Sequence, residues 1–184
     1  MIDADDLARA VCAPHSPIVA AIREEIGTDV VTPAGALDRR ALARRVFADA
    51  AARQRLEALT HPAILAELRA QIAAWQSRAR SDAVLVVVLP LLYEAGVDGL
   101  VDRVLVTDAP DETLVARAQA RDGLSDAEAR QRLAAQWPAA EKAARADYVV
   151  DTTGTLDDTR ARVRALWPAL VAESAAAAAG AGRA

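Results

Sequence analysis

The segment Ala83–Leu89 is the feature that most limits how this chain can fold. Its residues, AVLVVVL, are apolar without interruption and rich in valine. Such a run, with helical patterns before and after it, is typical of a strand buried on both faces of a parallel sheet. Pro90 cannot donate a hydrogen bond to a neighbouring strand, so the strand should end there. Leu91–Glu94 should then follow the carboxyl end of a strand, where open α/β sheets bind ligands.

Composition and charge narrow the class of protein. The chain has 184 residues, of which 53% are hydrophobic, and this is enough for one globular domain. Its net charge of −4 argues against a nucleic-acid-binding protein, and no apolar run reaches the length of a membrane span. The acidic start MIDADD is unlike a secretory signal, and the single cysteine, Cys12, excludes an internal disulfide. We therefore expect a cytoplasmic protein, while the oligomeric state is not readable from the sequence.

Capping residues and turns mark out the rest of the chain. Ser16-Pro17 begins a helix that Gly27 closes, Asp38 caps the next helix, and Asp49 starts a further short one. Further patterns are a long helix beginning at Thr60–Pro62, strands at 103–107 and 148–150, helices after Pro110 and Ser125, and a last helix after Thr155. Strands that alternate with helices predict an α/β fold with a parallel sheet. Residues 174–184 are rich in Ala and Gly, and we expect them to form a disordered tail.

Asp3-Ala4-Asp5 is the first candidate site. Two carboxylates just after a strand could hold a metal or accept a proton, but acidic residues also cap helices, and locally the two interpretations are equally supported. Phosphatases of the haloacid dehalogenase type also use an Asp-x-Asp pair. They need a full apolar strand before the pair, and the sequence shows only Met1 and Ile2 there.

Basic residues form the second candidate site. Arg117 and Arg121 lie four residues apart on one helical face, and further basic residues follow up to Arg145. Guanidinium groups suit phosphate oxygens because they donate hydrogen bonds in a fixed fork. A solvated basic face paired with nearby carboxylates is the simpler interpretation, and locally it is slightly favoured. The only lysine, Lys142, lies in the same stretch, and His61 at a helix start is by itself more typical of a cap or packed residue than of a catalyst.

Taken in order, these motifs resemble one family. The matching segments are Ile2–Asp5 with Ala8-Arg9, Leu37 with Arg39-Arg40, Val46-Phe47, His61-Pro62, Pro90–Glu94, Arg103-Val104, Arg117 with Arg121-Asp122, Gln136, and Ala146–Asp151 before Gly154. Together they resemble the dephospho-coenzyme A kinases, over nearly the whole chain up to about residue 170. The resemblance implies a P-loop-kinase-like parallel sheet flanked by helices, within a single domain at 1–170. It also implies a helical coenzyme A-binding region at about 16–80 and a lid at about 121–145.

The resemblance implies an activity and roles for individual residues. The family transfers the γ-phosphate of ATP, with Mg²⁺, to the 3′-hydroxyl of dephospho-coenzyme A, which is the last step of coenzyme A biosynthesis. The residues that match its catalytic positions are Asp5, Arg117 and Arg121. Those that match its acceptor-binding positions are Asp3, Arg9, Arg40, His61, Leu92 and Glu94. Arg117, Arg121, Thr152 and Thr153 match its ATP-binding positions, although many relatives carry Asn at one of the two threonines.

One family feature is absent from the 184 residues. No G-x-x-x-x-G-K-[ST] motif occurs, so the phosphate-binding loop, its lysine and its Mg²⁺ ligand have no counterpart, and we assign no metal ligand. The first strand, which is normally central, is missing with it. We expect the natural chain to begin about 30 residues earlier, and the chain as given to be truncated and inactive. The alternative is a non-catalytic coenzyme A-binding or regulatory homologue.

Overall fold

The computed structural model describes residues 1–80 and 83–181 of the chain. Its contacts divide the chain into two compact units. The first comprises Met1–Ala79 and Leu85–Pro90, and the second comprises the described residues of Arg80–Val84 and Leu91–Ala184. The segment expected to form a single domain therefore contains two units, each with its own short parallel sheet.

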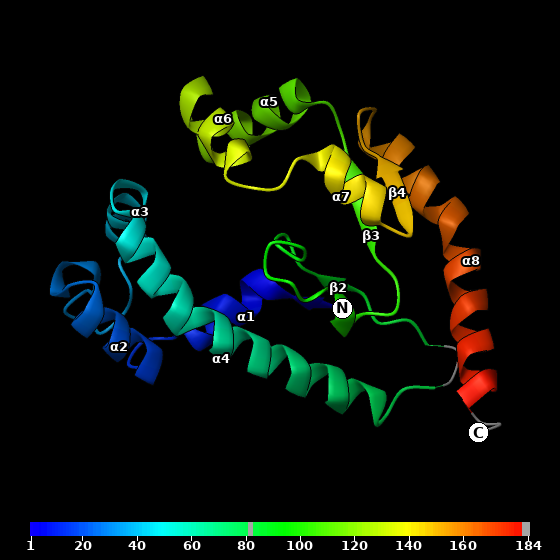
Figure 1. Cartoon of the computed structure of the whole chain (residues 1–184), viewed down its shortest axis with the longest axis horizontal. Helices are drawn as coiled ribbons and strands as arrows, with labels where there is room; N and C mark the ends of the chain where they lie inside the picture. The colour runs from blue at the N-terminus through cyan, green and yellow to red at the C-terminus, as the bar shows by residue number, and fades with distance from the viewer. Residues whose placement is uncertain (81–82, 182–184) are drawn as a thin grey trace. The chain divides into compact units, whose positions relative to one another are not determined.

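The first unit is mainly helical. Its elements are β1 (Ile2–Asp3), α1 (Ala4–Val11), α2 (Pro17–Glu25), a 3₁₀ turn at Thr28–Val30, α3 (Arg39–Ala48), α4 (Ala50–Gln76) and β2 (Val87–Val88). α1, α2 and α3 all pack against α4, the longest helix among the described residues (Figure 1). The core of this unit consists of Ile22, Ile26, Val30 and Leu42, which are buried together.

Local side-chain bonds explain where these helices begin. The Ser16 hydroxyl accepts a hydrogen bond from the Val19 amide at 3.2 Å, as the Ser-Pro pair predicts. Asp38 accepts bonds from the Arg40 and Ala41 amides at the start of α3. Asp49 both ends α3 and caps α4, accepting from the Ala51 amide at 2.8 Å. These three caps confirm the corresponding sequence predictions.

Two predicted helices are in fact one. The sequence indicated a new helix at Thr60–Pro62, whereas α4 runs without a break from Ala50 to Gln76 with Pro62 inside it. Proline lacks the amide that would continue the backbone pattern, and this usually interrupts a helix. Here the Thr60 hydroxyl donates to the Leu56 carbonyl at 2.8 Å, and packing of α1–α3 along α4 holds the helix together.

The valine-rich segment also differs from expectation. Only Val87–Val88 forms a strand, and it pairs in parallel with Ile2–Asp3. The side chains of Val86 and Val88 are 44% and 37% exposed, so this strand is not buried on both faces. The reason is that β2 has a single partner strand among the described residues.

The second unit is built on a longer strand pair. β3 (Leu105–Asp108) lies parallel to β4 (Tyr148–Asp151), in register from Leu105–Tyr148 to Asp108–Asp151. The other elements are a 3₁₀ turn at Asp98–Leu100, α5 (Asp111–Asp122), α6 (Asp126–Ala134), α7 (Ala139–Arg145) and α8 (Leu156–Ala181). α7 packs on β3 and α8 on β4 (Figure 1).

α8 extends further than the sequence suggested. We expected a disordered tail from residue 174, but the helix continues to Ala181, because alanine has the highest helix propensity of all residues. Glu173 explains part of this extension, since it accepts hydrogen bonds from Arg103, at 2.7 Å, and from the Tyr148 hydroxyl. The expectation for 182–184 lies outside the described residues. None of the described helices combines the length and apolarity that a membrane span requires.

Candidate active site

A pocket opens where β3 and β4 end in the second unit. It is lined by Thr107, Arg117, Thr152, Gly154, Leu156 and Thr159. The Leu156 side chain is 65% exposed, which is unusual for a large apolar residue and gives the pocket an apolar surface. The threonine hydroxyls and a guanidinium supply polar groups. This combination suits a ligand with a flat apolar part and an anionic part.

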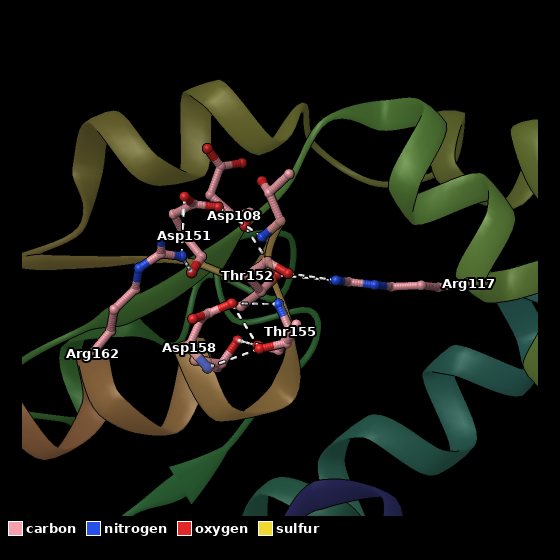
Figure 2. A network of polar contacts seen from close by, with 9 residues as sticks. Asp108, Arg117, Asp151, Thr152, Thr155, Asp158 and Arg162 are labelled. Atoms are coloured by element: carbon pink, nitrogen blue, oxygen red, sulfur yellow. Dashed lines mark hydrogen bonds and ion pairs between the residues drawn. The ribbon is translucent and has the colours of Figure 1, made fainter.

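Arg117 is fixed in this pocket by Thr152. Its Nη1 donates to the Thr152 hydroxyl at 3.0 Å, and its Nη2 donates to the Thr152 carbonyl oxygen (Figure 2). The Thr152 hydroxyl donates in turn to the Asp108 carbonyl oxygen, also at 3.0 Å. Thr152 therefore links the end of β3, the end of β4 and α5. Two residues predicted to bind ATP, Arg117 and Thr152, are thus brought together.

The turn that follows β4 is rigidly bonded. The Thr153 amide donates to Asp151 at 2.7 Å, and the Thr153 hydroxyl, together with this amide, lowers the pKa of Asp151. Arg162 on α8 forms an ion pair with Asp151 at 3.0 Å. Thr155 and Asp158 form reciprocal bonds at the start of α8, which confirms the predicted cap at Thr155 and lowers the pKa of Asp158. This turn holds its shape through its own contacts (Figure 2).

The second predicted arginine, Arg121, lies elsewhere in the same unit. Its guanidinium donates to both oxygens of Asp122, at 2.9 and 2.8 Å, and lowers the pKa of that carboxyl group. Arg132 on α6 also contacts Asp122, at 2.7 Å. Arg121 therefore takes part in an exposed ion-pair cluster, as the simpler interpretation of the basic stretch predicted, whereas Arg117 does not pair with a carboxylate in the contacts described.

Glu94 and Leu92 lie in the loop that follows β2. The Glu94 carboxylate is 2.7 Å from the Lys142 ammonium and accepts a bond from the Trp137 amide at 2.9 Å. One oxygen of the predicted acceptor ligand Glu94 is therefore occupied by protein groups. The Leu92 side chain is half-buried, and its carbonyl accepts a bond from the Val97 amide.

The remaining predicted site residues belong to the first unit. Asp3 ends β1 and caps α1, with its carboxylate accepting from the Asp5 amide at 2.8 Å. Asp5 is exposed in the first turn of α1, and Arg9 pairs with Asp6. Arg40 and His61 are exposed on α3 and α4. The capping and the catalytic interpretation of the Asp3–Asp5 pair are compatible. The cap uses the carboxylate of Asp3, and none of the hydrogen bonds described involves the carboxylate of Asp5.

A magnesium site does not fit the residues of this chain by themselves. Within 1–80 and 83–181, no three His, Cys, Asp or Glu side chains gather closely enough to hold a metal ion. The P-loop hydroxyl that binds Mg²⁺ in kinases also has no counterpart in the sequence. We therefore derive no step through a metal.

Some residues around the site carry no signal in the sequence. Asp108 contacts Thr152 across 44 residues and Arg162 contacts Asp151 across 11, while Lys142 and Trp137 reach Glu94 across more than forty. The one available signal was the position of Asp108 directly after a predicted strand, where ligand-binding residues of α/β sheets occur.

Comparison with known proteins identifies the family to which this chain belongs. The family model for dephospho-CoA kinase matches residues 1–158. The chain is 47% identical over 169 residues to the dephospho-CoA kinase of Symbiobacterium thermophilum, covering 92% of this chain and 70% of that protein. It is 49% identical over 154 residues to the enzyme of Anaeromyxobacter dehalogenans, covering 84% and 72%.

Solved structures agree with the sequence comparison. The protein TT1252 from Thermus thermophilus superposes with a TM-score of 0.64 at 36% identity, covering 92% of this chain and 83% of its own. Dephospho-CoA kinase from Campylobacter jejuni gives a TM-score of 0.64 at 27% identity, covering 90% and 82%. The fold is that of a nucleotide-dependent kinase, as predicted. The chain belongs to the dephospho-CoA kinase family, whose members are phosphotransferases of coenzyme A biosynthesis.

Proposed function

We propose that this chain carries the acceptor-binding region, the lid and part of the ATP site of a dephospho-coenzyme A kinase. The observation that carries the proposal is the pocket at the ends of β3 and β4, where Arg117 is held by Thr152 beside the exposed Leu156. Leu156 offers an apolar contact for a nucleobase, and Arg117 offers a fixed donor pair for phosphate oxygens. Thr153 would contribute to the same nucleotide site from the neighbouring turn. The protein would act in the cytoplasm.

The reaction assigns a role to each candidate residue. Asp5 takes the proton from the 3′-hydroxyl of the acceptor ribose, the freed oxygen bonds to the γ-phosphorus of ATP, and the bond to the β-phosphate oxygen breaks to release ADP. Asp3 and Arg9 position this base and the acceptor. Arg40 and His61, in the helical region at 16–80, bind the rest of dephospho-coenzyme A. Arg117 and Arg121 stabilise the charge on the phosphates, and the lid at about 121–145 covers them.

Part of the donor site has no counterpart in these 184 residues. The sequence contains no G-x-x-x-x-G-K-[ST] motif, and in kinases of this class that loop holds the β- and γ-phosphates and the Mg²⁺ that accompanies ATP. We therefore propose that the chain as given binds dephospho-coenzyme A but has negligible kinase activity. Fusion to a segment that supplies this loop should therefore give an active enzyme.

Calorimetry and a coupled ADP-release assay test this proposal. We expect dephospho-coenzyme A to bind and ADP release to stay at background, and we expect turnover once a P-loop segment from a relative is fused in frame. Arg117→Ala should weaken ATP binding to that fused chain by about 10-fold or more, because it removes two hydrogen bonds to a charged group. Arg160→Ala is the matched control, since Arg160 pairs only with Asp157 on the exposed face of α8 in the contacts described.

The outcomes separate the alternatives. Ordinary turnover by the chain alone would contradict the proposed inactivity. Binding of dephospho-coenzyme A with no turnover even after fusion would instead support a non-catalytic coenzyme A-binding or regulatory homologue. An acceptor other than dephospho-coenzyme A in a nucleotide screen would overturn the substrate assignment.

A further inference from the structure

The only lysine of the chain forms a largely buried ion pair. The Lys142 ammonium on α7 lies 2.7 Å from Glu94 Oε1, and the two side chains are only 14% and 17% exposed. The same oxygen accepts a hydrogen bond from the Trp137 amide at 2.9 Å. These contacts join the loop after β2 to the stretch 136–145 at two points of that stretch, entirely within the second unit.

An aromatic stack reinforces the same connection. The rings of Tyr93 and Trp137 are nearly parallel, with 6.0 Å between centroids and 12° between planes. The Arg145 guanidinium lies over the same indole, 4.7 Å from the Trp137 ring centroid. Two consecutive residues of the loop, Tyr93 and Glu94, thus both contact residues of the stretch 136–145.

This connection is costly to build. The Tyr93 hydroxyl and Glu94 Oε2 are buried without a hydrogen-bond partner among the described residues. Removing two opposite charges from water offsets much of their attraction, so a well-packed apolar pair would serve stability equally well. A buried ion pair with a directional hydrogen bond fixes position more strictly than apolar packing does. The arrangement therefore favours a role in positioning.

The other half of the expected lid is held differently. α6 is bonded to α5 through Arg130–Glu112 at 2.8 Å and Arg132–Asp122 at 2.7 Å, and all four side chains are 27–75% exposed. Exposed ion pairs contribute little and exchange readily with water. The segment 121–145 thus has an arm at 136–145 that is held by a largely buried ion pair, and an arm at 121–135 whose ion pairs are exposed, with Ala129 as its buried residue.

We propose that Glu94 is a positioning residue that anchors the arm 136–145 to the loop after β2, so that lid movement is confined to 121–135. That 121–145 acts as a lid rests on the proposed function, whereas the anchoring of 136–145 does not. It reassigns Glu94, which the family resemblance placed among the acceptor ligands. Glu94 would then not contact the acceptor, and it would affect the reaction only through its contacts with Lys142 and Trp137.

The single lysine makes a direct test possible. Acylation with an amine-reactive reagent, followed by mass spectrometry, reports on Lys142 alone apart from the amino terminus. Glu94→Gln keeps the shape and the bond from the Trp137 amide but removes the charge, and we expect it to raise the Lys142 acylation rate at least about five-fold. Glu112→Gln, which removes an exposed partner of Arg130, should leave that rate unchanged. Equal rates in all three proteins would overturn the anchor.

Hydrogen exchange and a double variant separate positioning from simple loss of structure. Glu94→Gln should raise exchange of the amides in 139–146 and leave those in 126–134 unchanged. Glu94→Gln combined with Lys142→Met leaves no unpaired buried charge and should restore most of the protection. A uniform rise over both arms, or no restoration in the double variant, would contradict the proposal.

Acceptor affinity completes the test. If Glu94 only positions the arm, Glu94→Gln should bind dephospho-coenzyme A within about two-fold of the parent chain, whereas loss of a direct ligand to the acceptor would weaken binding about 10-fold. The latter result with unchanged acylation would overturn the inference. If neither protein binds dephospho-coenzyme A, the proposed function fails, and the acylation and exchange results still decide the anchor.

Discussion

At the scale of single residues, Asp3 combines two roles. Its carboxylate caps α1 by accepting from the Asp5 amide, and its position at the carboxyl end of β1 is where we propose the acceptor hydroxyl to lie. Sequence patterns supported both roles equally, because an acidic residue at a helix start satisfies the helix in either case. Substitution by a neutral capping residue separates them.

Asp3→Ala removes the cap and should lower the free energy of unfolding by about 1 kcal/mol, whereas Asp3→Ser keeps a capping oxygen and should cost only a few tenths. Urea denaturation followed by circular dichroism measures both. In the chain completed with a P-loop segment, the two variants should lose kinase activity to a similar extent, because both lack the carboxylate. Full activity of Asp3→Ser would mean that Asp3 is only a cap.

Residue-scale features were predictable when they were local. The Ser125–Glu128 pair forms the capping box that its spacing predicted, and Ser16 and Asp38 cap the helices assigned to them. The pairing of Glu94 with Lys142 was not predictable, because no local pattern relates residues 48 positions apart in the chain. The resemblance identified Glu94 as important and gave it a direct role in acceptor binding.

At the scale of elements, the turn between α5 and α6 depends on one backbone conformation. Gly123 ends α5 with φ of 68°, in the left-handed region, and its amide donates to the Gln119 carbonyl at 2.9 Å. A side chain added there would meet no atom within 4 Å, so only the backbone conformation opposes substitution. The same empty surroundings are found at Gly99, which lacks a positive φ.

Gly123→Ala should therefore lower the free energy of unfolding by about 1 kcal/mol, because alanine disfavours the left-handed region. Gly99→Ala is the matched control and should be neutral or stabilise by a few tenths of a kcal/mol, by restricting the unfolded chain. Thermal unfolding of both variants checks this. A similar loss at both positions would show that the surroundings, and not φ, oppose the side chain.

Elements were predicted least well where tertiary packing overrides local preference. Pro62 indicated a helix start, but α4 continues past Pro62, because α1, α2 and α3 pack against it and stabilise it. The valine run indicated a strand buried on both faces, but burial depends on neighbours that the run itself does not encode. The predicted bounds of β3 and β4 differ from the observed bounds by at most two residues, because turn residues border both segments.

At the scale of the whole molecule, the carboxyl groups with a lowered pKa lie in the second unit. The pKa is lowered for seven of its carboxyl groups, those of Glu94, Glu112, Asp122, Glu128, Asp151, Asp158 and Glu173. For six of them the main cause is a hydrogen bond from a neighbouring side chain. For Glu94, burial acts in the opposite direction and is outweighed by the bonds from Lys142 and Trp137 and by the Lys142 charge.

A lowered pKa in the folded state stabilises the protein above the ordinary value, which is 4.5 for Glu and 3.8 for Asp. That contribution is lost as pH falls through the folded-state pKa. We therefore expect the urea midpoint to fall steeply below about pH 4.5. In a Trp75→Phe background, fluorescence of Trp137 and Trp167 reports on the second unit. Glu94→Gln should reduce the slope, and an unchanged slope would mean that Glu94 does not couple to acid unfolding.

The family and the fold class were predictable from the sequence because the motifs lie in a fixed order, and the match at residues 1–158 confirms both. The division into two units was not predictable, since no linker composition marks it. The pocket was only half predictable. Arg117 and Thr152 were singled out separately, and their contact follows from the parallel register of β3 and β4.

α4 has a mechanical consequence. With 27 residues it is a rod about 40 Å long, and Pro62 removes one amide donor near its midpoint. Such a rod flexes most easily at that joint, and a bend of about 10° there displaces its far tip by about 3–4 Å. His61 is next to Pro62 and would move whenever α4 bends there. Bending of α4 would therefore change the position of a residue that we propose to bind the acceptor.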